Sequence, residues 1–370
     1  MSISIKTSGR SLTLALLLVC SSHLQARETP AGGAPNEARS CDISEEVSGD
    51  VRLETGCVYR QQFRISTSAT TLDCRGAWLD GGGTLANGVV IDSKGKPLVD
   101  VIVKNCNIRG YESGVRVAWV KPDDQKGGSA NAFANAPSKV TLSHLHVVDS
   151  GRVGIYIDDH VHQVTIKDST IEGSGGVGMY LEYGTSDNHV LRNKFIRNGR
   201  AFKREGLAID SSRNNLVSGN LFEENERGGI FLYKNCGEHV ATGRSVPRTE
   251  HSDHNVIQGN TFSGEKVGVW IASRQSAELK RLDCSDKPMD ARGSYYEDFA
   301  NFNNVTGNAF CGTKVGIRVE GDNNTLTGNS YDRSTRKLID MPVSKRAQLL
   351  GRPSTGNEID AGKLVAGLCQ

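Results

Sequence analysis

One short motif recurs seven times in this chain and limits what the chain can fold into. Each copy begins with Gly and continues as an alternation of apolar and variable residues; we call it the glycine motif. The copies begin at Gly114, Gly154, Gly178, Gly206, Gly229, Gly268 and Gly316. A second motif, ending in Asn-x-Phe or Asn-x-Tyr, follows most copies and contributes Asn193, Asn220, Asn260, Asn308 and Asn329. Self-similarity at intervals as short as 21 residues, from Asn308 to Asn329, indicates a solenoid whose units pack on their neighbours.

The spacing and the alternation together predict the fold class. Alternation over four to six positions is the pattern of a strand with one buried face, and Gly, Asn, Asp and Ser between the motifs favour turns. We therefore predict an all-β, right-handed parallel β-helix, because a β-propeller needs four strands in units of about 40 residues. The repeated asparagines should form a hydrogen-bonded scaffold. The aromatic residues two positions later should stack in the interior: Phe195, Phe222, Phe262, Phe310 and Tyr331.

The N-terminal residues resemble an export signal. Lys6 and Arg10 precede an apolar run, residues 12–19, that is too short to anchor the chain in a membrane. We predict that residues 1–26 are a signal peptide and that the protein is periplasmic or secreted, without membrane insertion. Residues 27–40 are expected to be disordered. Residues 41–370 should form a single β-helix domain, with caps at about 41–70 and 333–370.

Charge and cysteine content restrict the partners and the compartment. Without residues 1–26 the chain has 42 basic and 42 acidic residues, so no charge excess suggests nucleic acid as a partner. Eight cysteines remain, an even number that suits an oxidising compartment. The repeat places Cys74 and Cys106 on adjacent rungs, and we expect them to pair. Three further disulfides are expected: Cys41–Cys57, Cys236–Cys284 and Cys311–Cys369.

Alignment of the seven glycine motifs separates inward from outward side chains, because strand residues alternate between the two faces. Several outward positions carry large aromatic or charged residues, which predicts a platform on which sugar rings stack. The substrate-binding residues predicted on this face are Arg116, Tyr156, Tyr180, Phe231, Trp270 and Arg318. Three long insertions, residues 120–137, 236–252 and 275–301, should rise along one edge and form a cleft.

The centre of the same face carries groups for proton transfer. Asp158, Glu182 and Asp210 lie on neighbouring rungs, so one of them should have a raised pKa or a Ca²⁺ ion should lie among them. A solvated acidic ladder without chemistry is the alternative. His160 or Tyr183 is the predicted base and Tyr233 the predicted acid. The cations predicted to neutralise a substrate carboxylate are Lys234 and Arg274.

At this point the chain resembles the right-handed β-helix carbohydrate-active proteins: pectate-type and alginate-type lyases, uronan C5-epimerases and polygalacturonases. The stretch from Tyr156 to His160 is similar to the Asp-Pro-His signature of alginate C5-epimerases, with Asp159 in place of proline. The resemblance implies base and neutralising roles for His160 and Asp158. The pair Asp158-Asp159 is also similar to the Asp-Asp pair of polygalacturonases, whose Gly-His-Gly and Arg-Ile-Lys motifs are absent here.

The function expected from these features is that of a polysaccharide lyase or C5-epimerase acting on an acidic, uronate-containing polysaccharide. Both reactions begin with removal of the C5 proton. An inverting glycoside hydrolase that uses two of Asp158, Glu182 and Asp210 is the first alternative. A non-catalytic glycan-binding β-helix protein is the second alternative, and fold alone does not decide among the three.

Overall fold

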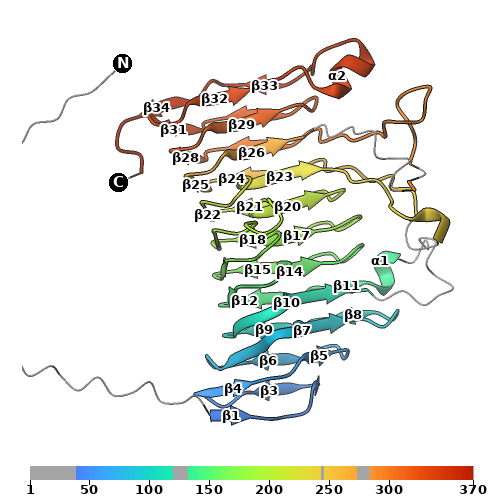
Figure 1. The fold of residues 1–370 in the computed structure, drawn as a ribbon, viewed down its shortest axis with the longest axis vertical. Coiled ribbons are helices and arrows are strands. Elements are labelled where there is room, and N and C mark those ends of the chain that lie inside the picture. The colour runs from blue at the N-terminus through green and yellow to red at the C-terminus, as the bar shows by residue number, and fades with distance from the viewer. Residues whose placement is uncertain (1–38, 120–131, 243–245, 273–282, 285, 370) are drawn as a thin grey trace, which may run out of the picture. The chain divides into compact units, whose positions relative to one another are not determined.

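Three ladders of short parallel strands wind along the chain and build a right-handed parallel β-helix (Figure 1). The computed structural model describes residues 39–119, 132–242, 246–272, 283–284 and 286–369. The predicted signal peptide therefore lies outside the described residues. Within the described part of the chain, no helix has the length and apolar character needed to span a membrane.

The first ladder contains the strands that carry the asparagine motif. Its strands are β1 (Arg39–Cys41), β4 (Cys57–Tyr59), β7 (Trp78–Asp92), β10 (Asn107–Ala118), β13 (His146–Val148), β16 (Thr170–Glu172), β19 (Lys194–Ile196), β22 (Leu221–Glu223), β25 (Thr261–Ser263), β28 (Ala309–Cys311), β31 (Ser330–Asp332) and β34 (Lys363–Val365). The long strands β7 and β10 continue into the second ladder.

The second ladder contains the glycine motifs. Besides β7 and β10 it comprises β2 (Glu46–Val47), β5 (Phe63–Ile65), β14 (Val153–Ile157), β17 (Met179–Leu181), β20 (Leu207–Asp210), β23 (Ile230–Tyr233), β26 (Val267–Ile271), β29 (Val315–Val319) and β32 (Lys337–Asp340). Gly154 shows why each motif starts with Gly. A Cβ there would lie 2.4 Å from Ile171 Cγ2 and 2.5 Å from the carbonyl oxygen of Gly178, so a side chain cannot be placed.

The third ladder closes each turn. It comprises β3 (Asp50–Arg52), β6 (Thr71–Asp73), β9 (Ile102–Lys104), β12 (Thr141–Ser143), β15 (Thr165–Lys167), β18 (His189–Leu191), β21 (Leu216–Ser218), β24 (Val256–Gln258), β27 (Asn304–Thr306), β30 (Thr325–Thr327) and β33 (Glu358–Ile359). The remaining elements are β8 (Leu98–Val99), paired with β11 (Pro137–Ser138), the helices α1 (Ala132–Asn135) and α2 (Lys345–Leu350), and the short helix η2 (Val240–Thr242).

The predicted interior scaffold is confirmed. Phe195, Phe222, Phe262, Phe310 and Tyr331 form one continuous stack, with ring centroids of successive residues 4.8 to 5.1 Å apart. The amide of Asn193 donates to Asn220 Oδ1 at 3.1 Å, and the same bond repeats from each motif asparagine to the next, as far as Asn329. Because these rings and amides are fully buried, they hold every rung at a fixed height and orientation.

The structure contains the predicted disulfides, and it has strands in the two segments expected to be caps. All four pairs form as expected: Cys41–Cys57, Cys74–Cys106, Cys236–Cys284 and Cys311–Cys369. In the segments expected to be caps, 41–70 and 333–370, strands β1 to β5 and β32 to β34 pair in register with the ladders. Strand β1 also begins at Arg39, within the segment expected to be disordered. These end rungs lack the glycine motif, which is why the repeat did not reveal them.

Candidate active site

The outward face of the second ladder has the register that the glycine motifs predicted. Arg116 pairs with Tyr156, Tyr156 with Tyr180, and Tyr180 with Ala208 on successive rungs. The series continues through Phe231 and Trp270 to Arg318. The described residues that follow β23, 234–242, leave the stack at the C-terminal end of that strand (Figure 1). The predicted insertions after β10 and β26 lie partly outside the described residues, at 120–131 and 273–282.

Most of the aromatic column is covered. Tyr180 is 9% exposed and Phe231 2%, and both belong to a separate apolar cluster outside the β-helix interior. The Arg204 guanidinium lies 5.9 Å from the Tyr180 ring, and that of Arg227 lies 5.6 Å from the rings of Phe231 and Trp270. Tyr156, Trp270, Arg116 and Arg318 remain half-buried. The expectation of one open aromatic platform is therefore corrected, because packed arginines cover its middle.

Each carboxylate at the centre of this face has an arginine partner. Arg116 Nη2 lies 2.7 Å from Asp158 Oδ2. Arg248 bridges two rungs: its Nη2 lies 2.9 Å from Glu182 Oε1, and its Nη1 lies 2.9 Å from Asp210 Oδ2. Two tyrosines complete the cluster, since Tyr156 donates to Glu182 and Tyr180 donates to Asp210. Like charges on adjacent rungs are thus compensated by guanidinium groups.

Arg248 reaches the cluster from a loop outside the repeats. Its backbone N–H donates to Asp286 Oδ1 at 3.1 Å, and that of Gly237 donates to Asp286 Oδ2 at 2.8 Å. The Cys236–Cys284 disulfide joins the same two segments. Asp286 is therefore the positioning residue that fixes the Arg248 loop over the face. The motif alignment could not identify Arg248, because the loop has no counterpart in the other repeats.

The two aspartates of the cluster differ in pKa. Burial, with Glu182 and Asp159 nearby, raises the pKa of Asp158 to about 8 despite Arg116. Burial acts in the same direction on Asp210, but Arg248, the Tyr180 hydroxyl and the backbone N–H of Asn235 outweigh it and lower the pKa of Asp210. The pKa values of Asp158 and Asp210 are thus shifted in opposite directions, although each side chain has an arginine partner. The predicted raised pKa lies on Asp158.

His160 occupies an aromatic cage beside the carboxylates. Its ring centroid lies 5.5 Å from that of Trp119, 5.2 Å from Phe133 and 5.4 Å from Tyr183. Tyr183 in turn lies 5.3 Å below the Arg248 guanidinium. The imidazole is 9% exposed, and its buried Nδ1 makes no hydrogen bond within the described part of the chain. The predicted base therefore adjoins a phenol, and that phenol adjoins a guanidinium.

Three other residues predicted to be catalytic have different surroundings. Lys234 is 2% exposed, and its Nζ lies 3.2 Å from Asp286 Oδ1 and 2.9 Å from the Glu297 carbonyl oxygen. Tyr233 is 1% exposed, accepts from Arg204 at 2.7 Å and donates to Glu205 at 2.9 Å. Burial in these pairs corrects the expectation that Lys234 and Tyr233 contact substrate. Arg274 lies outside the described residues.

Asp158, Glu182 and Asp210 do not fit a calcium ion in this arrangement. Ca²⁺ requires six to eight oxygen ligands around one point. Here Arg248 pairs with both Glu182 and Asp210, and Arg116 donates to Oδ2 of Asp158. Arginine therefore supplies the positive charge that the sequence suggested a metal would supply.

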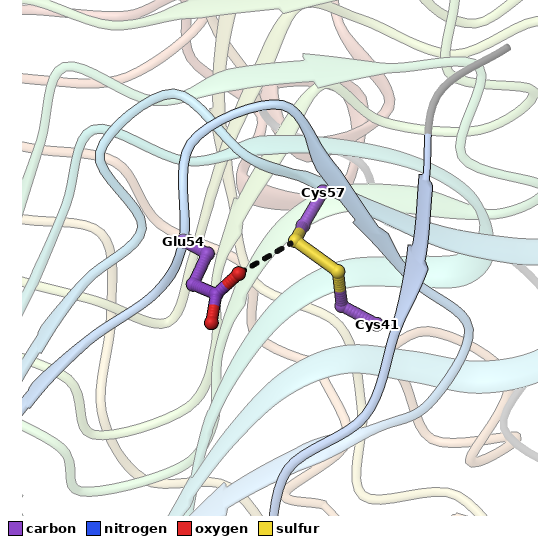
Figure 2. A group of neighbouring side chains, drawn as sticks. All are labelled: Cys41, Glu54 and Cys57. Carbon is purple, nitrogen blue, oxygen red and sulfur yellow. Dashed lines mark hydrogen bonds between the residues drawn. A yellow bond between two sulfur atoms is a disulfide. The ribbon is translucent and has the colours of Figure 1, made fainter.

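One other group of ligand-type side chains occurs in the described residues: Cys41, Glu54 and Cys57. Figure 2 shows the Glu54 carboxylate beside the Cys41–Cys57 disulfide. Its Oε2 atom lies 3.8 Å from Cys57 Sγ. Both sulfur atoms are bonded to each other and are unavailable as thiolate ligands. Glu54 also pairs with Arg39, so the group staples the first rung rather than forming a metal centre.

The comparisons with known proteins also indicate a right-handed β-helix. A family model described as right handed beta helix region matches residues 66–246, and one described as periplasmic copper-binding protein (NosD) matches residues 241–358. No curated protein matches the chain.

Among solved structures, the mannuronan C-5 epimerase AlgE6 A-module of Azotobacter vinelandii matches with a TM-score of 0.54 and 13% identity, over 87% of this chain and 84% of that one. An alginate lyase from Paenibacillus sp. matches with a TM-score of 0.43 and 11% identity, over 79% and 90%. The tailspike protein of E. coli bacteriophage HK620 in complex with a pentasaccharide matches with 0.40 and 11%, over 86% and 55%. The chain has the right-handed parallel β-helix fold.

Proposed function

We propose that the protein is an exported enzyme that removes the C5 proton of a uronate unit in an acidic polysaccharide, as a lyase or a C5-epimerase. One observation carries the proposal: His160, Tyr183 and Arg248 follow one another in contact on the outward face. This order places an imidazole next to a phenol and the phenol next to a guanidinium. These are the three groups that C5-proton removal requires.

The chemistry follows from the acidity of the proton. A C–H bond next to a carboxylate is a weak acid, because ionisation puts a second negative charge on the same group. Arg248 and Arg116 can stabilise the charge that develops on the substrate carboxylate. His160 takes the C5 proton in this scheme.

Tyr183 then separates the two outcomes. In a lyase, the Tyr183 hydroxyl gives its proton to the departing C4 oxygen while the C4–C5 double bond forms. In an epimerase, it returns a proton to the opposite face of C5. The two reactions share the residues and the first step. The fold that the chain shares with a mannuronan C-5 epimerase is compatible with both.

A retaining glycoside hydrolase is the second candidate, and the register of Asp158 and Glu182 favours it. These two residues occupy the same position on adjacent rungs, so they lie roughly 4.8 Å apart by strand spacing, near the ~5 Å of retaining enzymes. The inverting pair expected from sequence, Asp158 with Asp210, is less suitable because the Asp210 side chain is fully buried.

Export is supported by the four disulfides, which indicate an oxidising compartment. Together with the signal-like residues 1–26, they support a periplasmic or secreted location.

The test is incubation of the full chain with alginate and with polygalacturonate, followed by ultraviolet absorbance, proton NMR and a reducing-end assay. A new C4–C5 double bond identifies a lyase, and inverted C5 stereochemistry without cleavage identifies an epimerase. New reducing ends without a double bond favour the hydrolase. Binding without any product would leave the glycan-binding alternative and contradict the enzyme proposal.

A further inference from the structure

A column of basic residues runs beside the candidate active site, at the position two residues before the motif glycine or its aligned residue on most rungs of the second ladder. The register of the second ladder aligns these positions, since Leu207 pairs with Ile230, Val267 with Val315, and Val315 with Lys337. Six of seven consecutive rungs, from β14 to β32, carry Lys or Arg there. We call them the basic column: Arg152, Arg204, Arg227, Lys266, Lys314 and Arg336.

The break in the basic column has a steric cause. The seventh rung carries Gly176, where a Cβ would lie 2.3 Å from the carbonyl oxygen of Arg152. No side chain fits at that position. The basic residue is therefore missing for a steric reason, and no acidic residue replaces it. At roughly 4.8 Å per rung, the six steps from Arg152 to Arg336 span about 29 Å.

The basic column is directed to solvent. Arg152, Arg227, Lys266, Lys314 and Arg336 are exposed, and Arg204 is half-buried. Glu205 pairs with Arg204 and Glu226 with Lys266, so carboxylates compensate only part of the positive charge. The whole chain has a formal charge of only +2, which means that this concentration does not follow from a basic composition.

The basic column also has a direction. It starts on the Asp158 rung and continues toward the C-terminal end of the β-helix, whereas the rung before it carries the exposed acid Glu112. A row of separated cations next to half-buried aromatic rings is complementary to a long chain that repeats both a ring and a negative charge. Sugar acids in a polysaccharide have both features.

We propose that the basic column is a binding track for a polyanionic glycan, which extends the bound chain from the active site toward the C-terminal end. The proposal rests on the proposed function for the class of glycan, but it does not depend on the reaction. It implies that the affinity for the glycan grows with the length of the glycan up to about 29 Å, the length of the basic column. The affinity should also fall as the salt concentration rises, because salt screens these charges.

The test compares two full-length triple variants that remove the same charge. Arg152→Gln, Lys314→Gln and Arg336→Gln neutralise exposed members of the basic column. Arg52→Gln, Arg75→Gln and Lys139→Gln neutralise exposed residues on or next to strands of the third ladder. Binding to long alginate chains, to alginate dimers and to neutral dextran is measured at low and high salt, with thermal melting as the check on folding.

The expected result is a loss of about tenfold or more in affinity for long alginate in the column variant, with a weaker salt dependence. The third-ladder variant should bind like wild type, and dextran should bind neither variant nor wild type. Equal affinity of the two variants for long alginate overturns the proposal. So does column-dependent binding of phosphatidylglycerol vesicles or single-stranded DNA without binding of alginate.

The outcome is separable from that of the proposed function. Column-dependent binding of alginate without any product supports the track and overturns the chemistry. Turnover of alginate with unchanged affinity in the column variant supports the chemistry and overturns the track.

Discussion

The second and third ladders are built from the same repeats, yet their outward faces differ. In the third ladder, outward residues such as Thr165 and Lys167 are half-buried and border short turns. In the second ladder, outward residues such as Asp210 and Phe231 are buried: Arg248 pairs with Asp210, and Arg227 packs over Phe231. The comparison shows that arginines from an inserted loop and from the turns of the repeats, together with pairs between rungs, give this face its low exposure and its paired charges.

The turns that lead into the two ladders differ in the same way. An unbroken amide ladder leads into the third ladder and includes Asn215, Asn255 and Asn303. The ladder that leads into the second runs from Asn198 to Asn225 and then reaches a buried carboxylic acid, Glu265. The scaffold of the third ladder is neutral throughout these rungs, whereas that of the second contains a titratable group.

The largest expected effect is on catalysis. His160→Gln should lower turnover of the polyuronate by about 10²- to 10⁴-fold, the usual contribution of a general base. His162 is the matched control, because its ring packs on the same Phe133 ring while its backbone forms bridges to Ser138 and Ser186 on the adjacent rungs. Turnover measurements on both variants check the comparison. Equal losses in His160→Gln and His162→Gln would contradict the role of His160.

The next effect concerns stability. Arg248→Met leaves the buried Asp210 carboxylate without its cation and should cost about 3–5 kcal/mol of unfolding free energy. Arg213→Met removes an exposed partner of Glu250 and should cost less than about 1 kcal/mol. Denaturant unfolding of both variants gives the two values. A cost below 1 kcal/mol for Arg248→Met would show that the loop does not hold the charge pair in solution.

A smaller, pH-dependent effect is expected at Glu265. Burial raises the pKa of Glu265 to about 8, so the folded state holds a proton that the unfolded state has lost above about pH 4.5. Wild-type stability should therefore fall as pH rises from about 4.5 to 8. Glu265→Gln removes this dependence and should gain about 2 kcal/mol on wild type by pH 8. Unfolding curves at pH 5, 6.5 and 8 check it, and a constant difference would refute the assignment.

The smallest expected effect is the loss of a single hydroxyl group, compared between the outward faces of the second and third ladders. Tyr156→Phe removes the hydrogen bond to Glu182 and should cost about 1–2 kcal/mol. Thr165→Val on the third ladder should stay within about 0.5 kcal/mol. Thermal melting of the two proteins resolves the difference. Similar costs would mean that pairs between rungs do not make the second ladder distinct.

Much of the scaffold could be predicted from the sequence, because the repeat fixes it. The register of Tyr156 on Tyr180, the stack from Phe195 to Tyr331 and the pairing of Cys74 with Cys106 all follow from counting residues in a periodic strand pattern. The same counting placed Asp158, Glu182 and His160 on one face.

The parts of the site that depend on loops could not be predicted in this way. Arg248 lies in an insertion, so no period relates it to Glu182, and the sequence suggested a metal or Lys234 as the positive charge instead. Lys234 follows the end of β23, and its direction depends on where Asp286 lies. The burial of Phe231 likewise depends on how Arg227 packs over it.

The most direct test of the account uses a polyuronate labelled with deuterium at C5. Removal of the C5 proton is common to the lyase and the epimerase, so either enzyme must release the label into water, whereas a hydrolase or a binding protein leaves it in place. We expect release of deuterium by the wild-type chain and a loss of that release in His160→Gln. Products formed with the label fully retained would contradict proton abstraction at this site.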